Sequence, residues 1–351
     1  MRFTTFGGTA KYAGRCGRGV AGIAQFLACL LILAGVSSAQ NSSPPPAAPP
    51  AATTAPTPDT AAPQDAAPKD DDSGGFVFKK EVEEVILHAI VVDDQNRLIT
   101  GLASDNFKVY EDGKLQTVTS FHKERVPVAL GILIDNSGSM LPKRAKVNQA
   151  ALQLVDASQQ EDRVFVVNFG EDAYLDQDYT QDVGKLKAAL QRVETRGSTA
   201  LYDALIGAVD HLNQTSPLQK KVLLVVTDGR DNASQATFQE VLHKLQVKNG
   251  PVLYTIALGQ NDREDSSYRQ SLRKLSEQTG GTAFFPSTLD EIQSIASGIA
   301  QDIRSEYVID YRSSNPQTSG TYHSIQVQAL AGPAPLRVAT RTGYSSGDGS
   351  H

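Results

Sequence analysis

The 351-residue sequence is poor in cysteine and has no tryptophan. Its two cysteines, Cys16 and Cys29, both lie within the first forty residues. If that segment is removed, the mature protein has no thiol for a disulfide bond or for thiol-based catalysis. Histidine is also scarce, and the six histidines are scattered along the chain. These absences argue against a disulfide scaffold and a cysteine enzyme.

Positive charge is not concentrated anywhere in the body of the chain. The sequence has 33 Lys and Arg against 39 Asp and Glu, and its net charge is −6. This balance argues against nucleic acid as a partner. An HExxH pair and a glycine-rich phosphate loop are missing as well, and the letters GYSSG at 343–347 do not lie between a strand pattern and a helix pattern, as a GxSxG nucleophile elbow requires. The sequence therefore gives no motif for a hydrolase or a nucleotide-dependent enzyme, and we expect a protein that is not an enzyme.

Residues 1–39 have the features of a signal peptide. Basic residues precede the apolar stretch GVAGIAQFLACLLILAG, and small residues follow at Ser37 and Ala39, where a signal peptidase needs them. We therefore expect export to the periplasm, the cell surface or the medium. The alternative is an uncleaved membrane anchor, for which the apolar stretch is somewhat short. This segment is the one feature of the sequence that suggests contact with a membrane.

The composition then divides the chain into segments. Residues 40–75 are rich in proline and alanine and predict a disordered linker, and a short disordered tail is expected at 346–351. Runs rich in β-branched residues predict strands in 76–125, including a hairpin around Asp112-Gly113, and again in 306–345. Each β segment has too few strands for a domain of its own. We expect the two to form one small β-sandwich-like domain, or alternatively two separate pieces packed on the central domain.

Between 126 and 305, continuous apolar runs alternate with amphipathic stretches. The runs VALGILI, RVFVVNF, KVLLVVT and VLYTIAL are typical of strands that are covered on both faces. Apolar residues recur at helical spacing in the intervening stretches, as at Ile292, Ile295 and Ile299. Strand alternating with helix predicts an α/β fold, a doubly wound and mostly parallel sheet with helices on both faces.

Acidic and hydroxyl side chains follow two of these predicted strands. Asp135, Ser137 and Ser139 occupy alternate positions after GILI, and Asp228 follows KVLLVVT. Doubly wound sheets bind ligands outside the carboxyl ends of their strands. We call this edge of the sheet the carboxyl-end rim, and we expect both groups to lie on it. Alternate side chains of an extended segment point the same way, so the first three residues can face one point.

Thr199 is expected on the same rim although no strand precedes it. It lies in RGSTALYDAL, between helical patterns at 181–194 and 200–213. The segment EDAYLDQDY predicts a short antiparallel edge strand that runs away from the rim. The helix at 181–194 then returns to the rim and brings Thr199 with it.

The three loops would supply two carboxylates and three hydroxyls. These hard oxygen donors suit a divalent cation, Mg²⁺ before Mn²⁺ or Ca²⁺, and not zinc or copper. The structural alternative is that Ser139 and Thr199 cap helices and that the aspartates cap turns. Capping and metal binding are compatible, so this alternative does not remove the site.

Taken together, the elements DNSGS, GST and TDG resemble the metal-ion-dependent adhesion site of von Willebrand factor type A domains. The resemblance covers roughly residues 127 to 305. It implies that the serines and the threonine contact the metal directly or through water, and that the aspartates hold it largely through waters. It also implies a protein partner whose Asp or Glu completes the coordination. Carried over to this chain, the site residues are Asp135, Ser137, Ser139, Thr199 and Asp228.

Four acidic residues near these elements are further candidates. Asp203 lies one helical turn after Thr199. It is expected either to be a hydrogen-bond acceptor that supports the metal ligands or to be a solvated helix residue. Asp231 follows TDG and is better explained as a helix cap. Glu171 and Asp172 make the hairpin loop acidic, either as a solvated turn or as the border of a binding surface.

Three functions are compatible with these residues. The favoured one is an exported, metal-dependent protein-binding module for adhesion or assembly. The second is a structural envelope protein in which the metal only stabilises the rim. The third, a metal-dependent hydrolase, would need a general base beside the metal, and no histidine is expected on the rim.

Overall fold

The computed structural model describes residues 84–123, 126–192, 197–259, 266–315, 319–331 and 334–346. The predicted signal peptide, the predicted linker at 40–75 and residues 347–351 of the predicted tail lie outside the described residues. Within the described ranges, no helix is both long enough and apolar enough to cross a membrane.

The central part of the chain forms a six-stranded sheet with the order β10-β9-β8-β5-β6-β7. Its strands are β5 (Val128–Asp135), β6 (Arg163–Phe169), β7 (Ala173–Thr180), β8 (Lys220–Thr227), β9 (Val252–Ala257) and β10 (Ala283–Phe284). Neighbouring strands are parallel except β7, which pairs antiparallel with β6 at one edge. The predicted doubly wound, mostly parallel sheet is confirmed.

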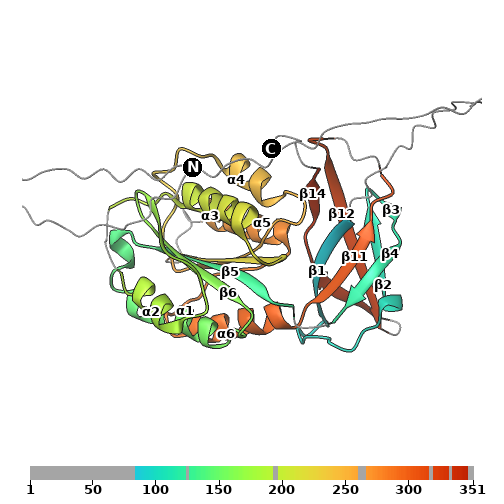
Figure 1. Ribbon diagram of the computed structural model, residues 1–351, viewed down its shortest axis with the longest axis horizontal. Coiled ribbons are helices and arrows are strands. Elements are labelled where there is room, and N and C mark those ends of the chain that lie inside the picture. Colours follow the sequence, from blue (N-terminus) through green and yellow to red (C-terminus); the bar gives the residue numbers. More distant parts are fainter. Residues whose placement is uncertain are drawn as a thin grey trace, which may run out of the picture. The chain divides into compact units, whose positions relative to one another are not determined.

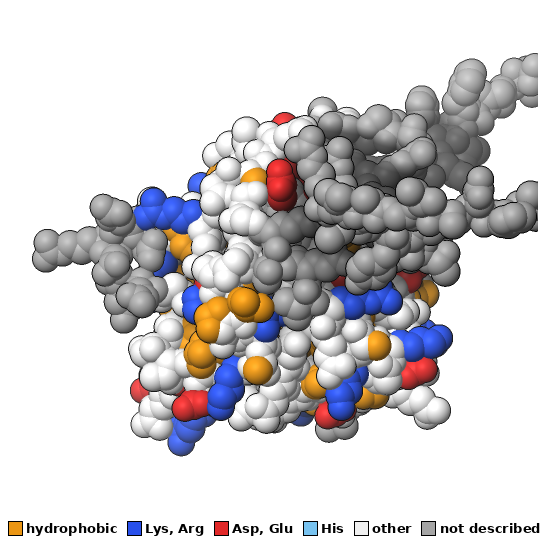
Figure 2. All heavy atoms as spheres, turned by 90° about the vertical axis from the view of Figure 1, so that its left-hand side faces the viewer, with side chains coloured by type: hydrophobic (Ala, Val, Ile, Leu, Met, Phe, Trp, Pro, Cys, Tyr) orange, Lys and Arg blue, Asp and Glu red, His pale blue; other side chains and the backbone are white. Residues whose placement is uncertain are grey.

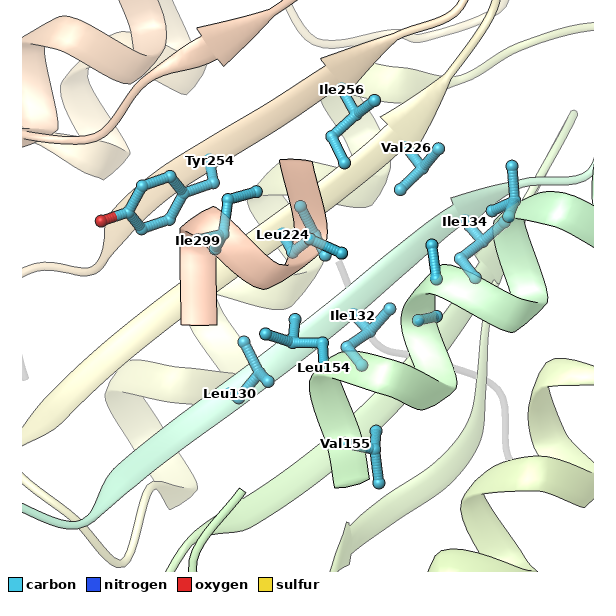
Figure 3. Close-up of a cluster of buried hydrophobic side chains, with 14 of the residues drawn as sticks. Leu130, Ile132, Ile134, Leu154, Val155, Leu224, Val226, Tyr254, Ile256 and Ile299 are labelled. Atoms are coloured by element: carbon cyan, nitrogen blue, oxygen red, sulfur yellow. The ribbon is translucent and has the colours of Figure 1, made fainter. Parts of the chain in front are cut away.

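Helices cover both faces of this sheet (Figure 1). One face carries α1 (Arg144–Asp156), α2 (Val183–Leu190) and α6 (Glu291–Arg304), and the other carries α3 (Leu201–Thr215), α4 (Phe238–Leu245) and α5 (Ser266–Thr279). Every residue of β5 is buried, because its alternate side chains enter two different cores. Figure 3 shows one of them, where Leu154 of α1 lies near Leu130 and Ile132 of β5, and Ile299 of α6 lies near Leu224 of β8.

The strands on either side of the central domain build one antiparallel sheet. The first group is β1 (Glu84–Val92), β2 (Phe107–Glu111), β3 (Lys114–Leu115) and β4 (Val118–His122), with the short 3₁₀ helix η1 (Ser104–Asn106) before β2. The second group is β11 (Tyr307–Arg312), β12 (Tyr322–Ala331), β13 (Ala334–Ala339) and β14 (Gly343–Ser345). β1 pairs with β11 and β13, and β2 pairs with β12. A flanking β domain made from both chain segments is therefore present.

This sheet curls so that its two ends pack against each other. The strand order is β3-β2-β12-β13-β1-β11-β4, with β14 paired to β12. Phe107 of β2 nevertheless contacts Phe121 of β4, with ring centroids 5.3 Å apart, and both contact Tyr307. The sandwich-like core is thus enclosed by a single curled sheet. The predicted hairpin is also present, with Asp112 and Gly113 at φ values of 50° and 77°, as a tight hairpin turn requires.

Candidate metal centre

Asp135 lies buried at the end of β5 and connects two strand ends. Its Oδ1 accepts a hydrogen bond of 2.7 Å from the Ser137 N–H, and its Oδ2 accepts one of 2.7 Å from the Thr227 hydroxyl at the end of β8. Burial raises the pKa of the Asp135 carboxyl, and the nearby charge of Asp228 acts in the same direction. The two hydrogen bonds fix the carboxylate in place.

The two serines connect the first loop to the β8 loop. Ser137 precedes the short 3₁₀ helix η2 (Gly138–Met140), on which Ser139 lies. The two hydroxyl oxygens are 3.2 Å apart, and the Ser139 hydroxyl donates a hydrogen bond of 2.8 Å to Oδ1 of Asp228. Residues 89 positions apart in the chain are therefore in direct contact at the carboxyl-end rim.

Thr199 is brought to the same place by Asn232, which follows β8. The Thr199 N–H donates to the Asn232 side-chain oxygen at 2.8 Å, and the Asn232 N–H donates to the Thr199 carbonyl at 3.0 Å. The hydroxyl of Thr199 faces Gly229, because a Cβ atom placed on that glycine would lie 3.5 Å from Oγ1 of Thr199. Thr199 is thus adjacent to the residue that follows Asp228.

Two basic residues at the start of α1 balance these carboxylates. The Lys143 ammonium group forms an ion pair with Oδ2 of Asp228. The Arg144 guanidinium is buried and donates to the Asn168 side chain at 3.1 Å and to the Leu190 carbonyl at 3.0 Å. Burial lowers the pKa of Arg144 to about 10, so it stays charged at neutral pH.

The donor set fits a small divalent cation. In an octahedral shell with metal–oxygen distances of about 2.1 Å, adjacent ligand oxygens lie about 3 Å apart. The separations from Ser139 Oγ to Ser137 Oγ and to Asp228 Oδ1, 3.2 and 2.8 Å, are of this size. All five side chains offer oxygen, and two carboxylates match the charge of one divalent ion.

Asp203 and Asp231 accept hydrogen bonds that hold the loops of the candidate site together. Asp203 is buried rather than solvated, and its carboxylate accepts the N–H groups of Gln235 and Ala236 at 2.9 and 3.0 Å. Asp231 accepts the Tyr202 N–H at 2.8 Å, so it caps the start of α3 from a loop 29 residues away. Both residues fasten the loop after β8 to the Thr199 loop.

Glu171 and Asp172 are exposed in the turn between β6 and β7. The carbonyl of Gly170 in this turn accepts the Ala200 N–H at 2.6 Å. The acidic turn therefore adjoins the Thr199 loop.

Sequence reasoning missed the roles of Lys143, Arg144 and Thr227. One indication was available, because two basic residues at the start of a helix oppose the helix dipole and call for a nearby negative partner. Thr227 could have been noticed as a third hydroxyl beside TDG. The pairing of Asn232 with Thr199 gives no indication in the sequence, since it joins two loops that only the fold brings together.

A second group of possible ligands lies in the β domain, formed by Glu111, Asp112 and His323. Its carboxylates already have partners of their own. Glu111 accepts hydrogen bonds from the hydroxyls of Tyr311 and Ser313 at 2.6 and 2.5 Å. Asp112 accepts the Ser324 N–H and faces His323 Nδ1, both at 2.8 Å. We assign a structural role to this closed network.

Residues 130–230, which include all five candidate ligands, match the family model of the von Willebrand factor type A domain. This chain contains a von Willebrand factor type A domain. The predicted family and the predicted fold class are both confirmed. The match begins within β5 and ends two residues after Asp228.

Curated relatives share this part of the chain. The calcium-activated chloride channel regulator 1 of Sus scrofa is 29% identical over 163 residues, which are 44% of this chain and 17% of that protein. The regulator 3A-1 of Mus musculus is 30% identical over 165 residues, with the same coverage. The chain therefore spans less than a fifth of the length of these relatives.

A solved structure of a von Willebrand factor type A protein from Catenulispora acidiphila aligns with 78% of this chain and 76% of that one. The sequence identity is 14% and the TM-score is 0.44.

Proposed function

We propose that this protein is an exported, metal-dependent protein-binding module that acts in adhesion or assembly. A divalent cation, Mg²⁺ first, would be held by Asp135, Ser137, Ser139, Thr199 and Asp228. The observation that carries the proposal is the hydrogen bond between Ser139 and Asp228, which joins two distant parts of the motif at one point. The bound cation would supply a Lewis-acidic position for an oxygen ligand from outside. Asp135 would orient the shell, because its two oxygens are fixed by Ser137 and Thr227.

The partner would present an Asp or Glu side chain to this cation. Leu141, directly after η2, is 58% exposed and offers an apolar contact next to the site. Figure 2 shows the side of the molecule that is on the left in Figure 1, where apolar side chains lie among Lys and Arg side chains. A mixed surface of this kind suits a protein partner, which contributes apolar contacts around one buried acidic anchor. The exposed Glu171 and Asp172 would favour basic residues around that anchor.

The first experiment measures metal binding by isothermal titration with Mg²⁺ and Mn²⁺. We expect wild type to bind one ion, and Asp135→Ala and Ser139→Ala to lose that binding. Ser139→Ala serves as the second variant because Ser139 is exposed and the loss of its hydroxyl leaves the core intact. Asp105→Ala, an exposed acid in η1 of the β domain, is the matched control and should bind normally.

The second experiment captures partners from the native envelope or secreted fraction, with and without a chelator. Capture should disappear in the chelator and with Ser139→Ala. A partner that is retained undiminished in the chelator contradicts metal-dependent binding. If the variants lower only the melting temperature and leave every interaction intact, the metal is structural.

A further inference from the structure

A cavity lies where β1 meets the starts of β8 and β9. None of the residues that line it is a candidate metal ligand. Its volume is about 330 Å³. It is lined by residues of both domains: Ile86, His88, Ser216, Pro217, Leu218, Gln219, Lys221, Asn249, Gly250, Val252, Thr279 and Arg341. Direct contacts between the domains surround it, such as the hydrogen bond of 3.2 Å from the Ile86 N–H to the Asn249 side chain.

The charges that line this cavity are all of one sign. Lys221 and Arg341 contribute positive charge, and none of the lining residues that the structure describes is an aspartate or glutamate. The histidine in the wall, His88, faces Glu306 at 3.3 Å and so has an acidic neighbour. The cavity therefore has two cations whose charge is not balanced by its own wall.

Arg341 is the more deeply buried of the two, at 5% exposure. Its guanidinium donates to the carbonyls of Val247 and Gly250 at 3.0 and 3.1 Å. Among the residues that the structure describes, no carboxylate forms an ion pair with it. Burial lowers the pKa of Arg341 to about 10, so the group still carries its charge at neutral pH. A buried charge without a counterion is costly, and proteins usually pair it.

Lys221 adds a second positive charge to the same wall. Its ammonium donates to the Asn213 side chain at 3.0 Å, a neutral partner. Burial, and after it the charge of Arg341, lower the pKa of Lys221, which shows that the two cations repel each other. The adjacent Lys220 differs, because it forms an ion pair of 2.6 Å with Glu306. Within the described part of the chain, the fold thus supplies a counterion to Lys220 and not to Lys221.

We propose that this cavity binds a small organic anion with a compact, doubly charged head, either a phosphate group or a dicarboxylate. Lys221 and Arg341 would neutralise the head. The apolar side chains of Ile86, Leu218 and Val252 would contact the remainder of the molecule, for which 330 Å³ leaves room beyond a bare oxyanion.

Such a ligand would also join the two domains. Ile86 and Arg341 belong to the segments of the β domain, whereas Lys221 and Leu218 belong to the von Willebrand factor type A domain. Because the ligand would bind the folded arrangement and not the unfolded chain, its binding adds to stability by mass action.

The test uses the full mature chain after metal removal and dialysis, so that metal binding cannot contribute. The probes are inorganic phosphate, glycerol 3-phosphate and succinate, compared with sodium chloride at equal ionic strength and with glycerol. At 10 mM, we expect at least one anion to raise the melting temperature by about 3 °C or more, and chloride and glycerol to have no such effect. The order of the three anions separates a phosphate head from a dicarboxylate.

Lys221→Gln should weaken the binding of that anion about tenfold or more, as measured by calorimetric titration. Lys244→Gln, which removes a surface lysine paired with Asp210 at 2.7 Å, is the matched control and should bind as wild type does. If no anion raises the melting temperature above the chloride reference, the proposal is wrong. It is equally wrong if Lys221→Gln binds the anion as tightly as the control.

Discussion

The ammonium group of Lys143 forms an ion pair with the same carboxylate that accepts a hydrogen bond from Ser139. Asp228 is the acceptor in both contacts, and its side chain is fully buried while Lys143 is 26% exposed. One short segment after β5 thus supplies a hydroxyl and a cation to a residue almost ninety positions later. A divalent cation at the proposed site would approach this carboxylate too, so the lysine and the metal would repel each other.

Replacing Lys143 with methionine should therefore strengthen metal binding. Removing one positive charge next to a divalent cation is worth on the order of 1–2 kcal/mol near a protein surface, which corresponds to about tenfold in affinity. Titration with Mn²⁺ measures this. Lys146→Met is the control, because that ammonium pairs with the exposed Asp290 at 2.8 Å and should leave affinity unchanged. Equal or weaker Mn²⁺ binding by Lys143→Met would show that the lysine does not compete with the metal.

Asn232 should matter for metal binding although it supplies no ligand. Its side-chain oxygen accepts the Thr199 N–H at 2.8 Å, so Asn232→Ala leaves that donor without its partner. We expect a loss of about 1 kcal/mol in the free energy of unfolding and a metal affinity weaker by a few fold. Urea unfolding and metal titration measure the two effects. Gln153→Ala removes an exposed contact with Ser297 and should change neither. Wild-type metal affinity in Asn232→Ala would mean that Thr199 is positioned without this clamp.

Stability should fall with rising pH because of Asp302 in α6. Burial, reinforced by the charge of Glu306, raises the pKa of Asp302 from 3.8 to about 6. Between these values the native state binds more protons than the unfolded state. The contribution to stability is therefore complete below pH 4 and is lost as pH rises through 6. Asp302→Asn should stabilise the protein by on the order of 1 kcal/mol at pH 7.5 and have little effect at pH 4.

Denaturant unfolding of wild type and Asp302→Asn at pH 4, 6 and 7.5 checks this dependence. Asp290→Asn is a useful comparison, because the hydrogen bond and charge of Lys146 lower the pKa of Asp290. The contribution of Asp290 to stability is present above its ordinary pKa and is lost at lower pH. This pH dependence is opposite in sign to that of Asp302. If Asp302→Asn raises the free energy of unfolding equally at pH 4 and at pH 7.5, titration of Asp302 is excluded as the cause.

The sheet could be predicted in detail because its central strands β5, β6, β8 and β9 are buried on both faces. The run from Val128 to Asp135 has no polar alternation, so it could only be a central strand of a covered sheet. The antiparallel edge strand β7 followed from chain direction, since the next loop had to return to the rim. The sequence left open whether Asp203 is an acceptor or a solvated helix residue. Its position on the helix was clear, but its partners Gln235 and Ala236 lie in a loop more than thirty residues away.

By itself, the sequence determined the strand and helix pattern and the three loops that carry the oxygen donors, because hydrophobic periodicity and chain direction are local properties. The tertiary structure decided which charges accompany those donors. Lys143 meets Asp228, and Asn232 holds Thr199, only after separate loops are packed side by side. It also decided that Lys220 has a counterion, whereas Lys221 and Arg341 have none among the described residues. Burial and charge pairing depend on residues distant in the chain, and no local pattern specifies them.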